Sequence, residues 1–284
     1  MKKVLVTGGN GQLASCIKDI DKTAEAYEFI YVDLPELDIT DNAQVRGFFN
    51  ANELSYCVNC AAYTAVDNAE SEQQLATSVN VLGAKNLAEA CKAYGAVMFQ
   101  ISTDFVFDGR QGQVYAENDP TNPLGVYGLT KLQGEQAVAD TLKAHFILRT
   151  SWLYSEHGHN FVKTMLRLGA ERDTLNVVGD QIGTPTYAGD LAHLILQLIS
   201  QESDGYGTYH YSNEGVASWY DFAKAIFDLA KLDCNVLPIL TEAYPTPAKR
   251  PAFSVMDKSK IKDKYRVQIP YWRESLGRVI QKLI

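Results

Sequence analysis

The chain opens with KKVLVTGGNGQLA at residues 2–14, and this stretch decides the fold. KKVLVT is an apolar run of strand length, and TGGNGQLA places Gly8, Gly11 and Ala14 directly after it. Glycines permit a tight turn and a close backbone approach, and a helix N-terminus presents N–H groups to a phosphate. The stretch therefore predicts the strand, loop and helix of a dinucleotide-binding unit, with an ordinary strand-to-helix turn as the alternative.

The chain continues as strands that alternate with helices. Helical spacing of apolar residues predicts helices at 41–51 and 71–94. Such an alternation produces right-handed βαβ units, so we expect an α/β fold with a Rossmann-like, doubly wound parallel sheet. Further strands are predicted at YEFIYVD (27–33), YCVNCAA (56–62), AVMFQIS (96–102) and HFILRTSW (145–152).

After about residue 155 this alternation becomes less regular. We predict an NAD(P)-binding domain at 1–155 and a mainly substrate-binding lobe at 156–284, from which later strands can return to the sheet. The proline-rich segment 241–257 predicts an irregular loop on that lobe. Other elements are expected as a helix near 158–170, a polar loop at 179–186, a helix at 189–200, a strand at 207–213 and a helix at 218–232.

Composition excludes several classes of protein. The chain has 284 residues, 46% of them hydrophobic, and a formal net charge of −8, which argues against a nucleic-acid or membrane-surface protein. No apolar run approaches the roughly 18 residues of a membrane span, and the N-terminal run is too short for a signal peptide, so we expect a cytoplasmic protein. The five cysteines are scattered through apolar segments and predict reduced core thiols. The histidines show no ligand spacing, so we expect no metal.

Acidic residues after the second strand indicate which cofactor binds. Asp33 ends that strand, 22 residues after Gly11, where a carboxylate accepts the ribose hydroxyls of the adenosine. An acid there favours NAD over NADP, because it repels a 2′-phosphate. Asp38 and Ile39 are the next residues that could border the adenine. A nicotinamide or a flavin dinucleotide fits this pattern.

A second motif carries candidate catalytic groups. In GVYGLTK, residues 125–131, Tyr127 and Lys131 stand four apart on one face of a predicted helix. For an arbitrary pair, a surface lysine is the simple interpretation. Thr103 and Asp104, however, follow the strand AVMFQIS and so face the ligand crevice of a parallel sheet. A hydroxyl, a phenol and an ammonium are the groups that carbonyl reduction needs, with Tyr127 as the proton donor whose pKa Lys131 lowers. The set favours NADPH or NADH.

These segments together resemble the extended short-chain dehydrogenase/reductases, and more closely the dTDP-4-dehydrorhamnose reductase family. The motifs that carry the resemblance are TGGNGQLA, NCAAYTAVDNAE, STDFVFDG, VYGLTK, RTSWLY, DQIGTPT and YPTPAKRP, from residue 3 to beyond residue 256. The resemblance implies reduction of the C4 keto group of dTDP-6-deoxy-L-lyxo-4-hexulose to dTDP-L-rhamnose, with a nucleotide sugar as partner and a homodimer as one oligomeric option. Some members bind a divalent cation through glutamates near the N-terminus, whereas this chain has Ala14 and Ser15 there.

The resemblance also implies roles for individual residues. Thr103, Tyr127 and Lys131 match the catalytic hydroxyl, the proton donor and the lysine that also holds the nicotinamide ribose. The family's phosphate loop corresponds to Gly8, Gly11, Gln12 and Leu13 here. Its residues that border the adenine correspond to Asp38 and Ile39. The nicotinamide side matches Ala61, Ala62 and Tyr63, with Asn80 nearby unless it is only a polar core residue. The family's sugar-contacting tryptophan corresponds to Trp152, unless this residue belongs to the core. The substrate diphosphate would be bound by Lys249 and Arg250. Weaker candidates for lining the sugar pocket are Val66, Asn160 and Gln181.

Phe105 narrows the chemistry. Related nucleotide-sugar dehydratases have Thr-Asp-Glu where this chain has Thr103, Asp104 and Phe105, and phenylalanine cannot move a proton. Simple keto reduction therefore remains. Two other interpretations stay open: a regulatory NADP-binding protein resembling the β subunit of methionine adenosyltransferase, and a reductase or epimerase of another nucleotide sugar.

Overall fold

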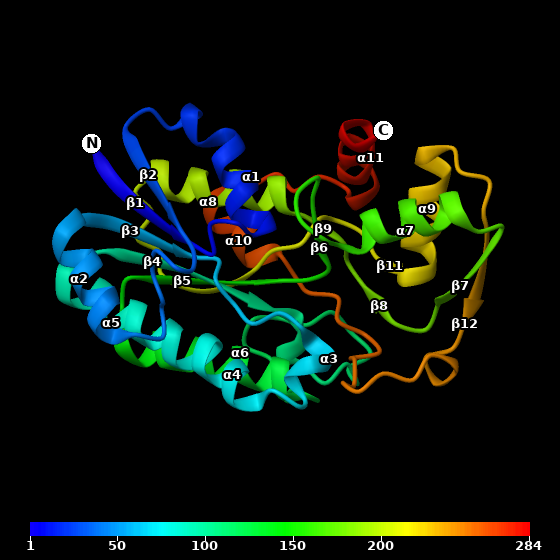
Figure 1. The fold of residues 1–284 in the computed structure, drawn as a ribbon, viewed down its shortest axis with the longest axis horizontal. Coiled ribbons are helices and arrows are strands. Elements are labelled where there is room, and N and C mark those ends of the chain that lie inside the picture. The colour runs from blue at the N-terminus through cyan, green and yellow to red at the C-terminus, as the bar shows by residue number, and fades with distance from the viewer.

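A computed structural model describes residues 1–284 and contains a six-stranded parallel sheet at its centre (Figure 1). The strand order is β10-β5-β4-β3-β1-β2, and every neighbouring pair is parallel. The expected doubly wound α/β fold is confirmed. The strands of this sheet are β1 (Lys2–Thr7), β2 (Tyr27–Val32), β3 (Leu54–Asn59), β4 (Val97–Thr103), β5 (His145–Thr150) and β10 (Gly207–His210).

Helices cover both faces of the sheet because side chains alternate along each strand. Val4 and Val6 pack into a core cluster with residues of α1 and α8, whereas Leu5 packs into a second cluster with residues of α2 and α5. Both faces are therefore buried, as expected for parallel strands that are apolar throughout. The helices of these two layers are α1 (Gln12–Ile20) and α8 (Ala188–Ser200) on one side, and α2 (Asn42–Asn52), α5 (Ala84–Tyr94) and α6 (Val126–Thr141) on the other.

The second lobe lies beyond the carboxyl ends of the strands, on the right of Figure 1. It contains α7 and α9 with three two-stranded sheets, β12-β7, β11-β8 and β6-β9. Its elements are β6 (Leu153–Tyr154), α7 (Phe161–Glu171), β7 (Thr174–Val178), β8 (Ile182–Gly183), β9 (Thr186–Tyr187), β11 (Ala217–Ser218), α9 (Trp219–Ala230), β12 (Asn235–Ile239), the short helix Thr241–Ala243 and α11 (Trp272–Leu283). α10 (Ser259–Tyr265) instead lies against the main sheet, where the Tyr265 ring meets Phe146 of β5 and Tyr209 of β10 (Figure 1).

Residues after 155 serve both lobes. β10 pairs with β5 in the main sheet, and α8 shares a core cluster with α1. The return of a later strand to the sheet is thus observed, and the chain crosses between the lobes more than once.

The long helix expected at 71–94 is interrupted. It consists of α4 (Gln73–Thr77), a π-helical turn at Ser78–Gly83 and then α5, with the short α3 (Val66–Ala69) before it. A π turn inserts one residue per turn and often marks a functional site. Here it directs Asn80 toward the segment that follows β3. The other small elements are 3₁₀ turns at Asp21–Thr23 and Asp104–Val106.

None of the helices combines the length and the apolar character that a membrane crossing requires.

Candidate active site

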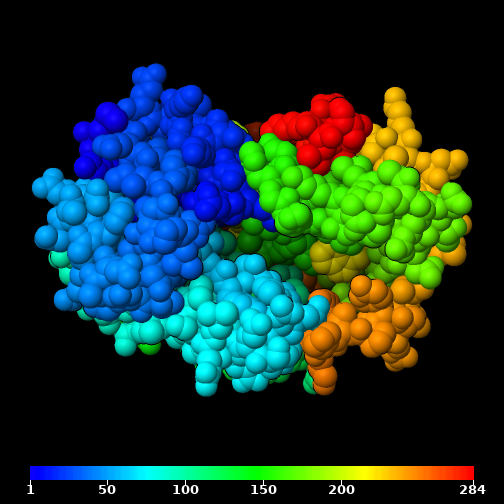
Figure 2. All heavy atoms as spheres, in the orientation of Figure 1, coloured from blue at the N-terminus to red at the C-terminus, as the bar shows by residue number.

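A cavity of about 730 Å³ opens at the carboxyl ends of the central strands. The strand order reverses between β1 and β3, which is where doubly wound sheets bind ligands. Figure 2 shows the hollow between the lobe that carries residues 1–100, blue to cyan, and the green and orange lobe. Residues 150–153, Gly158 and His159 also line it, so both lobes form its walls.

The glycine loop after β1 shapes one end of this cavity. Gly8 has a φ of +63°, and a Cβ on it would stand 2.8 Å from the backbone nitrogen of Ala61. A side chain at position 8 would therefore clash with the backbone of the segment that follows β3. Gly11 precedes α1, whose N-terminal N–H groups face the cavity with Gln12 and Leu13. The loop fits a dinucleotide pyrophosphate, which needs donors and a surface without side chains.

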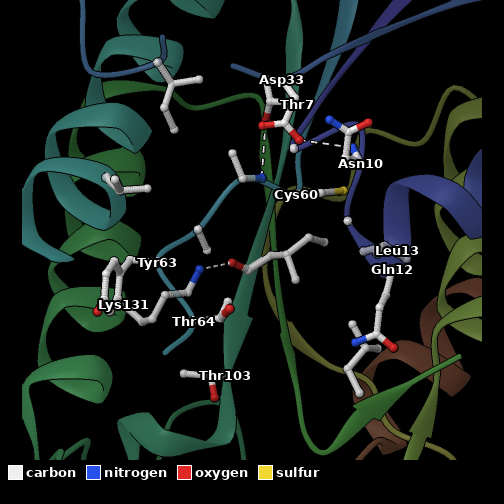
Figure 3. Close-up of a pocket in the computed structure, with 18 of the residues that line it drawn as sticks. Thr7, Asn10, Gln12, Leu13, Asp33, Cys60, Tyr63, Thr64, Thr103 and Lys131 are labelled. Carbon is white, nitrogen blue, oxygen red and sulfur yellow. Dashed lines mark hydrogen bonds between the residues drawn. The ribbon is translucent and has the colours of Figure 1, made fainter. Parts of the chain in front are cut away.

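Asp33 lies at the same end of the cavity, directly after β2 (Figure 3). Its carboxylate accepts hydrogen bonds from Asn10 N at 3.1 Å and from Leu34 N at 3.0 Å, which fix its orientation next to the glycine loop. Asp38 and Ile39 line the adjoining wall. The assignment of these residues to the ribose and the adenine stays a prediction.

The segment after β3 forms the middle of the cavity. Ala61, Ala62 and Tyr63 line it, whereas Asn80 lies behind them and is 2% exposed. The Asn80 amide accepts a hydrogen bond from Tyr63 N at 2.9 Å and donates to Tyr63 O at 3.2 Å. Asn80 was predicted near the cofactor, but it does not line the cavity and instead holds the backbone of the lining residue Tyr63. Asn80 also donates to Thr130 Oγ1 at 3.1 Å and so ties the segment to α6.

Two glycines allow α6 to approach the sheet closely. A Cβ on Gly128 would lie 2.2 Å from Phe105 O, and one on Gly134 would lie 2.2 Å from Asn80 O. The helix therefore packs backbone to backbone against the residues after β4 and against the π turn. This packing brings Tyr127 and Lys131 into the cavity wall beside Thr103.

The pKa of Tyr127 differs from the sequence expectation. Burial raises the pKa of this phenol to about 12, a hydrogen bond with Thr103 lowers it in part, and the Asp104 carboxylate raises it. The expected lowering by Lys131 was wrong, because the ammonium is directed elsewhere: Lys131 Nζ donates to Ile101 O at 2.6 Å (Figure 3). Tyr127 therefore keeps its proton at neutral pH.

Lys131 is 4% exposed, and burial lowers its pKa to about 8, while Glu135 acts to raise it. Glu135 lies one helical turn further on and accepts from Ser102 Oγ at 2.5 Å. It also accepts from Arg149, with Nη2 at 2.7 Å and Nε at 3.0 Å. A buried ion pair of Glu135 and Arg149 therefore lies close to Lys131, near the carboxyl ends of the strands.

Thr103 ends β4, and Asp104 begins the 3₁₀ turn that follows. Asp104 was expected to face the ligand crevice, but it is buried and does not line the cavity. Thr103 lines the cavity and accepts from Phe105 N at 3.2 Å. Asp104 is 1% exposed and lies beside Thr103, with 3.1 Å between Thr103 Oγ1 and Asp104 Oδ1. The Phe105 ring meets Tyr127 edge to face, with 5.5 Å between the centroids.

Trp152 begins the wall contributed by the second lobe. Its backbone has a φ of +48°, and its indole stacks on Trp219 with 3.6 Å between centroids and an interplanar angle of 7°. A Cβ on Gly183 would meet the indole at 2.7 Å, so both the second tryptophan and this glycine hold the ring in place. Trp152 lines the cavity, and its contact with a sugar stays a prediction.

The basic pair of the proline-rich loop is divided between two environments. Arg250 donates to Asp67 of α3 at 2.8 and 3.1 Å, and so joins the loop to the segment after β3 (Figure 1). Ala248 N donates to the same carboxylate at 3.2 Å. Lys249 is exposed and makes no ion pair. The hydrogen bonds of Arg250 leave its Nε donor unused, so a diphosphate could bind Arg250 beside Asp67 or in its place.

The weaker pocket candidates lie outside the cavity lining. Asn160 caps α7 by accepting from Lys163 N at 3.1 Å, and it donates to Gln12 Oε1 at 2.8 Å. Gln181 is buried and donates to Thr241 Oγ1 at 3.1 Å. Val66 begins α3 and is only partly buried. Asn160 and Gln181 thus join loops around the cavity.

Sequence reasoning missed several residues of the site. Trp219 lies 67 positions after Trp152, and no local pattern pairs them. Asp67 could have been found, because it falls inside the AAYTAVDNAE motif and carries the charge opposite to Arg250. Other lining residues that were not predicted include Thr7, Asn10, Leu37, Cys60, Thr64, Thr150, Ser151 and His159.

One cluster of possible metal ligands lies apart from the catalytic groups. Cys16, Asp19 and His157 have ligand atoms within 4.8 Å of one another. His157 Nε2 is 2.6 Å from Asp19 Oδ2, and this pair accounts for the proximity as a surface interaction.

Comparison with known proteins agrees with this geometry. The family model described as RmlD substrate binding domain matches residues 1–284. A dTDP-4-dehydrorhamnose reductase from Aggregatibacter actinomycetemcomitans is 42% identical over 98% of this chain and 98% of its own length. The spore coat polysaccharide biosynthesis protein SpsK from Bacillus subtilis is 40% identical over 99% of this chain and 98% of its own.

Solved structures give the same result. The dTDP-4-dehydrorhamnose reductase of Bacillus anthracis, in complex with NADP, superposes with a TM-score of 0.96 at 43% identity and covers 99% of this chain and 100% of its own. The Thermus thermophilus UDP-glucose 4-epimerase, in complex with NAD, shares the fold with a TM-score of 0.81 at 22% identity. The chain therefore belongs to the RmlD substrate binding domain family.

Proposed function

We propose that this chain is an oxidoreductase that reduces the C4 keto group of dTDP-6-deoxy-L-lyxo-4-hexulose to give dTDP-L-rhamnose, with NADPH or NADH. One observation carries the proposal: Thr103, Tyr127 and Lys131 line the same cavity as the glycine loop. A bound reduced nicotinamide supplies the hydride. The chain must then hold the cofactor, orient the ketone and deliver a proton to its oxygen.

In this proposal each cofactor residue acts on one part of the dinucleotide. The loop from Gly8 to Leu13 binds the pyrophosphate, Asp33 the adenosine ribose, and Asp38 with Ile39 the adenine. The segment from Ala61 to Tyr63 borders the nicotinamide side. The glycine cradle and the fixed Asp33 carboxylate support this assignment.

The ketone needs a proton donor that still holds its proton when the substrate arrives. Tyr127 fits this role, because burial raises its pKa to about 12. Thr103 donates a second hydrogen bond to the ketone oxygen. The Lys131 ammonium favours the negative charge that develops nearby, in a dry site where such charges interact strongly. Phe105 stands against Tyr127 where a dehydratase needs its base, so elimination of water is not expected.

The sugar and diphosphate would be held from the second lobe. Trp152 offers an indole face to the sugar, and Lys249 with Arg250 offers donors to the diphosphate. Val66, Asn160 and Gln181 are proposed to shape the pocket through the loops that they join. The regions 1–155 and 156–284 are proposed to divide between cofactor and substrate binding.

The test follows the loss of reduced-nicotinamide absorbance with the dTDP-4-keto-6-deoxy-L-sugar, for the wild type and Tyr127→Phe. We expect wild-type turnover and a loss of about 10²–10⁴-fold in kcat for the variant, since a positioned proton donor contributes that much. Retained cofactor binding by Tyr127→Phe, measured by fluorescence titration, is the control for folding. Wild-type cofactor binding without turnover would exclude this substrate and favour another nucleotide sugar or a regulatory role.

We also propose that the protein works in the cytoplasm and forms a homodimer. The likeness to enzymes of nucleotide-sugar metabolism supports the first point. Sedimentation velocity tests the second, where a single species of 31.5 kDa would exclude the dimer.

A further inference from the structure

The Asp104 carboxyl has few hydrogen-bond partners for a buried carboxylate. The residue is 1% exposed, and its Oδ2 is buried without any hydrogen-bond partner. Its Oδ1 has the Thr103 hydroxyl at 3.1 Å. Burying a charged oxygen without a donor is costly, so the surroundings favour the neutral acid.

The groups around Asp104 do not supply a compensating charge. Burial raises its pKa to about 6, and the nearby hydroxyls of Ser254 and Thr103, with the backbone N–H groups of Asp104 and Phe105, lower it only in part. Tyr127 of α6 is the titratable side chain that interacts with it, and Ser254, from the C-terminal segment, is uncharged. No ammonium, guanidinium or imidazole group is among the causes of its shift.

The protonation state of Asp104 decides which acceptor the Thr103 hydroxyl can donate to. A threonine hydroxyl has one proton and two lone pairs, and Phe105 N already donates to one of the lone pairs. If Asp104 is ionised, it can only accept, so the single threonine proton is drawn to the carboxylate. If Asp104 is protonated, its O–H donates to the second lone pair, and the threonine proton is free for another acceptor, either the Tyr127 phenol oxygen or the ketone.

We propose that Asp104 acts in its protonated form as a positioning residue, which donates to Thr103 Oγ1 and so directs the threonine hydroxyl toward the substrate carbonyl. This inference rests on the proposed reduction and adds to it. Thr103 touches the ketone, and Asp104 decides whether Thr103 can donate to it. Ionisation of Asp104 turns that donor away from the substrate.

The first experiment measures kcat/KM from about pH 5 to about pH 9, because this parameter reports the ionisations of the free enzyme. The proteins are the wild type, Asp104→Asn and the control Asp140→Asn, which removes an exposed acid of α6. We expect kcat/KM of the wild type and the control to fall through the pKa of Asp104 to a plateau about tenfold or more lower, the effect of one well-placed hydrogen bond. Asp104→Asn keeps a permanent donor, so this fall should be absent, while a fall due to Lys131 remains at higher pH.

A double-mutant cycle tests whether Asp104 acts through Thr103. Asp104→Ala alone should lower kcat/KM by about tenfold or more at low pH, the effect of one well-placed hydrogen bond. In a Thr103→Ala background, the same change should have almost no further effect. KM for the cofactor and its binding by fluorescence should stay unchanged in both backgrounds, as a check on folding.

Infrared difference spectra of the protein with bound cofactor test the protonation without turnover. The wild type minus Asp104→Asn spectrum should show a protonated carboxyl band at low pH that disappears as the pH rises. An alkaline fall that persists in Asp104→Asn, additive losses in the cycle, or no such band would each overturn the inference. Absence of wild-type turnover at every pH would instead overturn the proposed reduction, and this inference with it.

Discussion

Burial has opposite consequences for the two candidate catalytic side chains of α6. It raises the pKa of the Tyr127 phenol to about 12 and lowers that of the Lys131 ammonium to about 8. Both shifts have the same cause, since a low-dielectric site disfavours the charged form of each group. The phenol stays a proton donor over the working range, and the lysine is the group of the pair whose charge changes near neutral pH.

Glu135 should therefore control the second alkaline fall of activity, which lies at higher pH than the fall assigned to Asp104 and is called here the alkaline limit. Its carboxylate raises the pKa of Lys131, so Glu135→Gln removes that support and lets burial lower the pKa further. Lys131 is charged below its pKa, and the fall of kcat/KM at high pH should move to lower pH in the variant. The measurement is a pH profile of kcat/KM.

The control is Glu171→Gln, which removes an exposed acid that pairs with Arg167. Its alkaline limit should match that of the wild type. Because Glu135→Gln also leaves Arg149 unpaired, we expect a lower melting temperature, and the assay belongs well below it. An alkaline limit that does not move in Glu135→Gln would contradict the assignment of that limit to Lys131.

Asp33 should influence the choice between NADH and NADPH. Its carboxylate is held beside the glycine loop by Asn10 N and Leu34 N, so it stays where a 2′-phosphate would approach. Asp33→Asn removes the negative charge and keeps the size. We expect the ratio of kcat/KM for NADPH to that for NADH to rise at least about tenfold, since like charges a few ångströms apart repel strongly. An unchanged ratio would place the adenosine ribose elsewhere.

At the scale of one element, α6 depends on two glycines. A Cβ on Gly128 would stand 2.2 Å from Phe105 O. Either α6 or the backbone at Phe105 would therefore have to move to make room for it. Tyr127 is the adjacent residue, and Thr103 lies two residues before Phe105. Displacement of this contact therefore separates the phenol from the hydroxyl.

Gly128→Ala should reduce activity more than its helix propensity would suggest. Overpacking of this kind typically costs ~1–3 kcal/mol of stability, and the shift of Tyr127 should lower kcat well beyond the fraction unfolded. Gly47→Ala is the matched control, because Gly47 lies inside α2 with open space around its Cβ position. That change should leave kcat unchanged and raise stability by up to about 1 kcal/mol. Thermal unfolding and steady-state kinetics test both variants.

At the scale of the whole molecule, the proline-rich loop and α3 meet across one side of the cleft. Arg250 bonds Asp67 in a contact that joins positions 183 residues apart. If Arg250 leaves Asp67 to bind the diphosphate, substrate binding breaks this contact. The pair would then be a bridge that holds the cleft wall before the nucleotide sugar binds.

Two variants separate these roles. Arg250→Ala should raise KM for the nucleotide sugar about tenfold or more with little change in kcat, because a charged donor to the diphosphate is lost. Asp67→Asn removes only the competing acceptor, so KM should change little or fall. Arg167→Ala, at an exposed ion pair of α7, serves as the control for loss of an arginine. Equal increases of KM in Arg250→Ala and Asp67→Asn would show that the pair is structural and that Arg250 does not contact the diphosphate.

The local sequence predicted the central strands and most helices, because apolar runs and helical spacing are properties of short stretches. The β1 glycine loop, the helix that carries Tyr127 and Lys131, and the return of a later strand were all visible there. The π turn at Ser78–Gly83 was not, since it arises where Asn80 bonds the Tyr63 backbone and α6 presses against the turn. The two-residue strands β6, β8, β9 and β11 of the second lobe were missed because so short a pairing leaves no periodicity in the sequence. The five-residue strands β7 and β12 were missed as well.

By itself, the sequence determined the doubly wound class, the cofactor loop and the identity of the candidate proton donor, because each depends on residue types at short spacing. Only the tertiary structure decided how these groups are charged and aimed. Lys131 turns to Ile101 O instead of the phenol, Arg250 pairs with Asp67, and Asp104 is buried beside Thr103 without a cation. The physical reason is that burial, close packing and hydrogen-bond partners come from residues distant in sequence, and these surroundings set every pKa in the site.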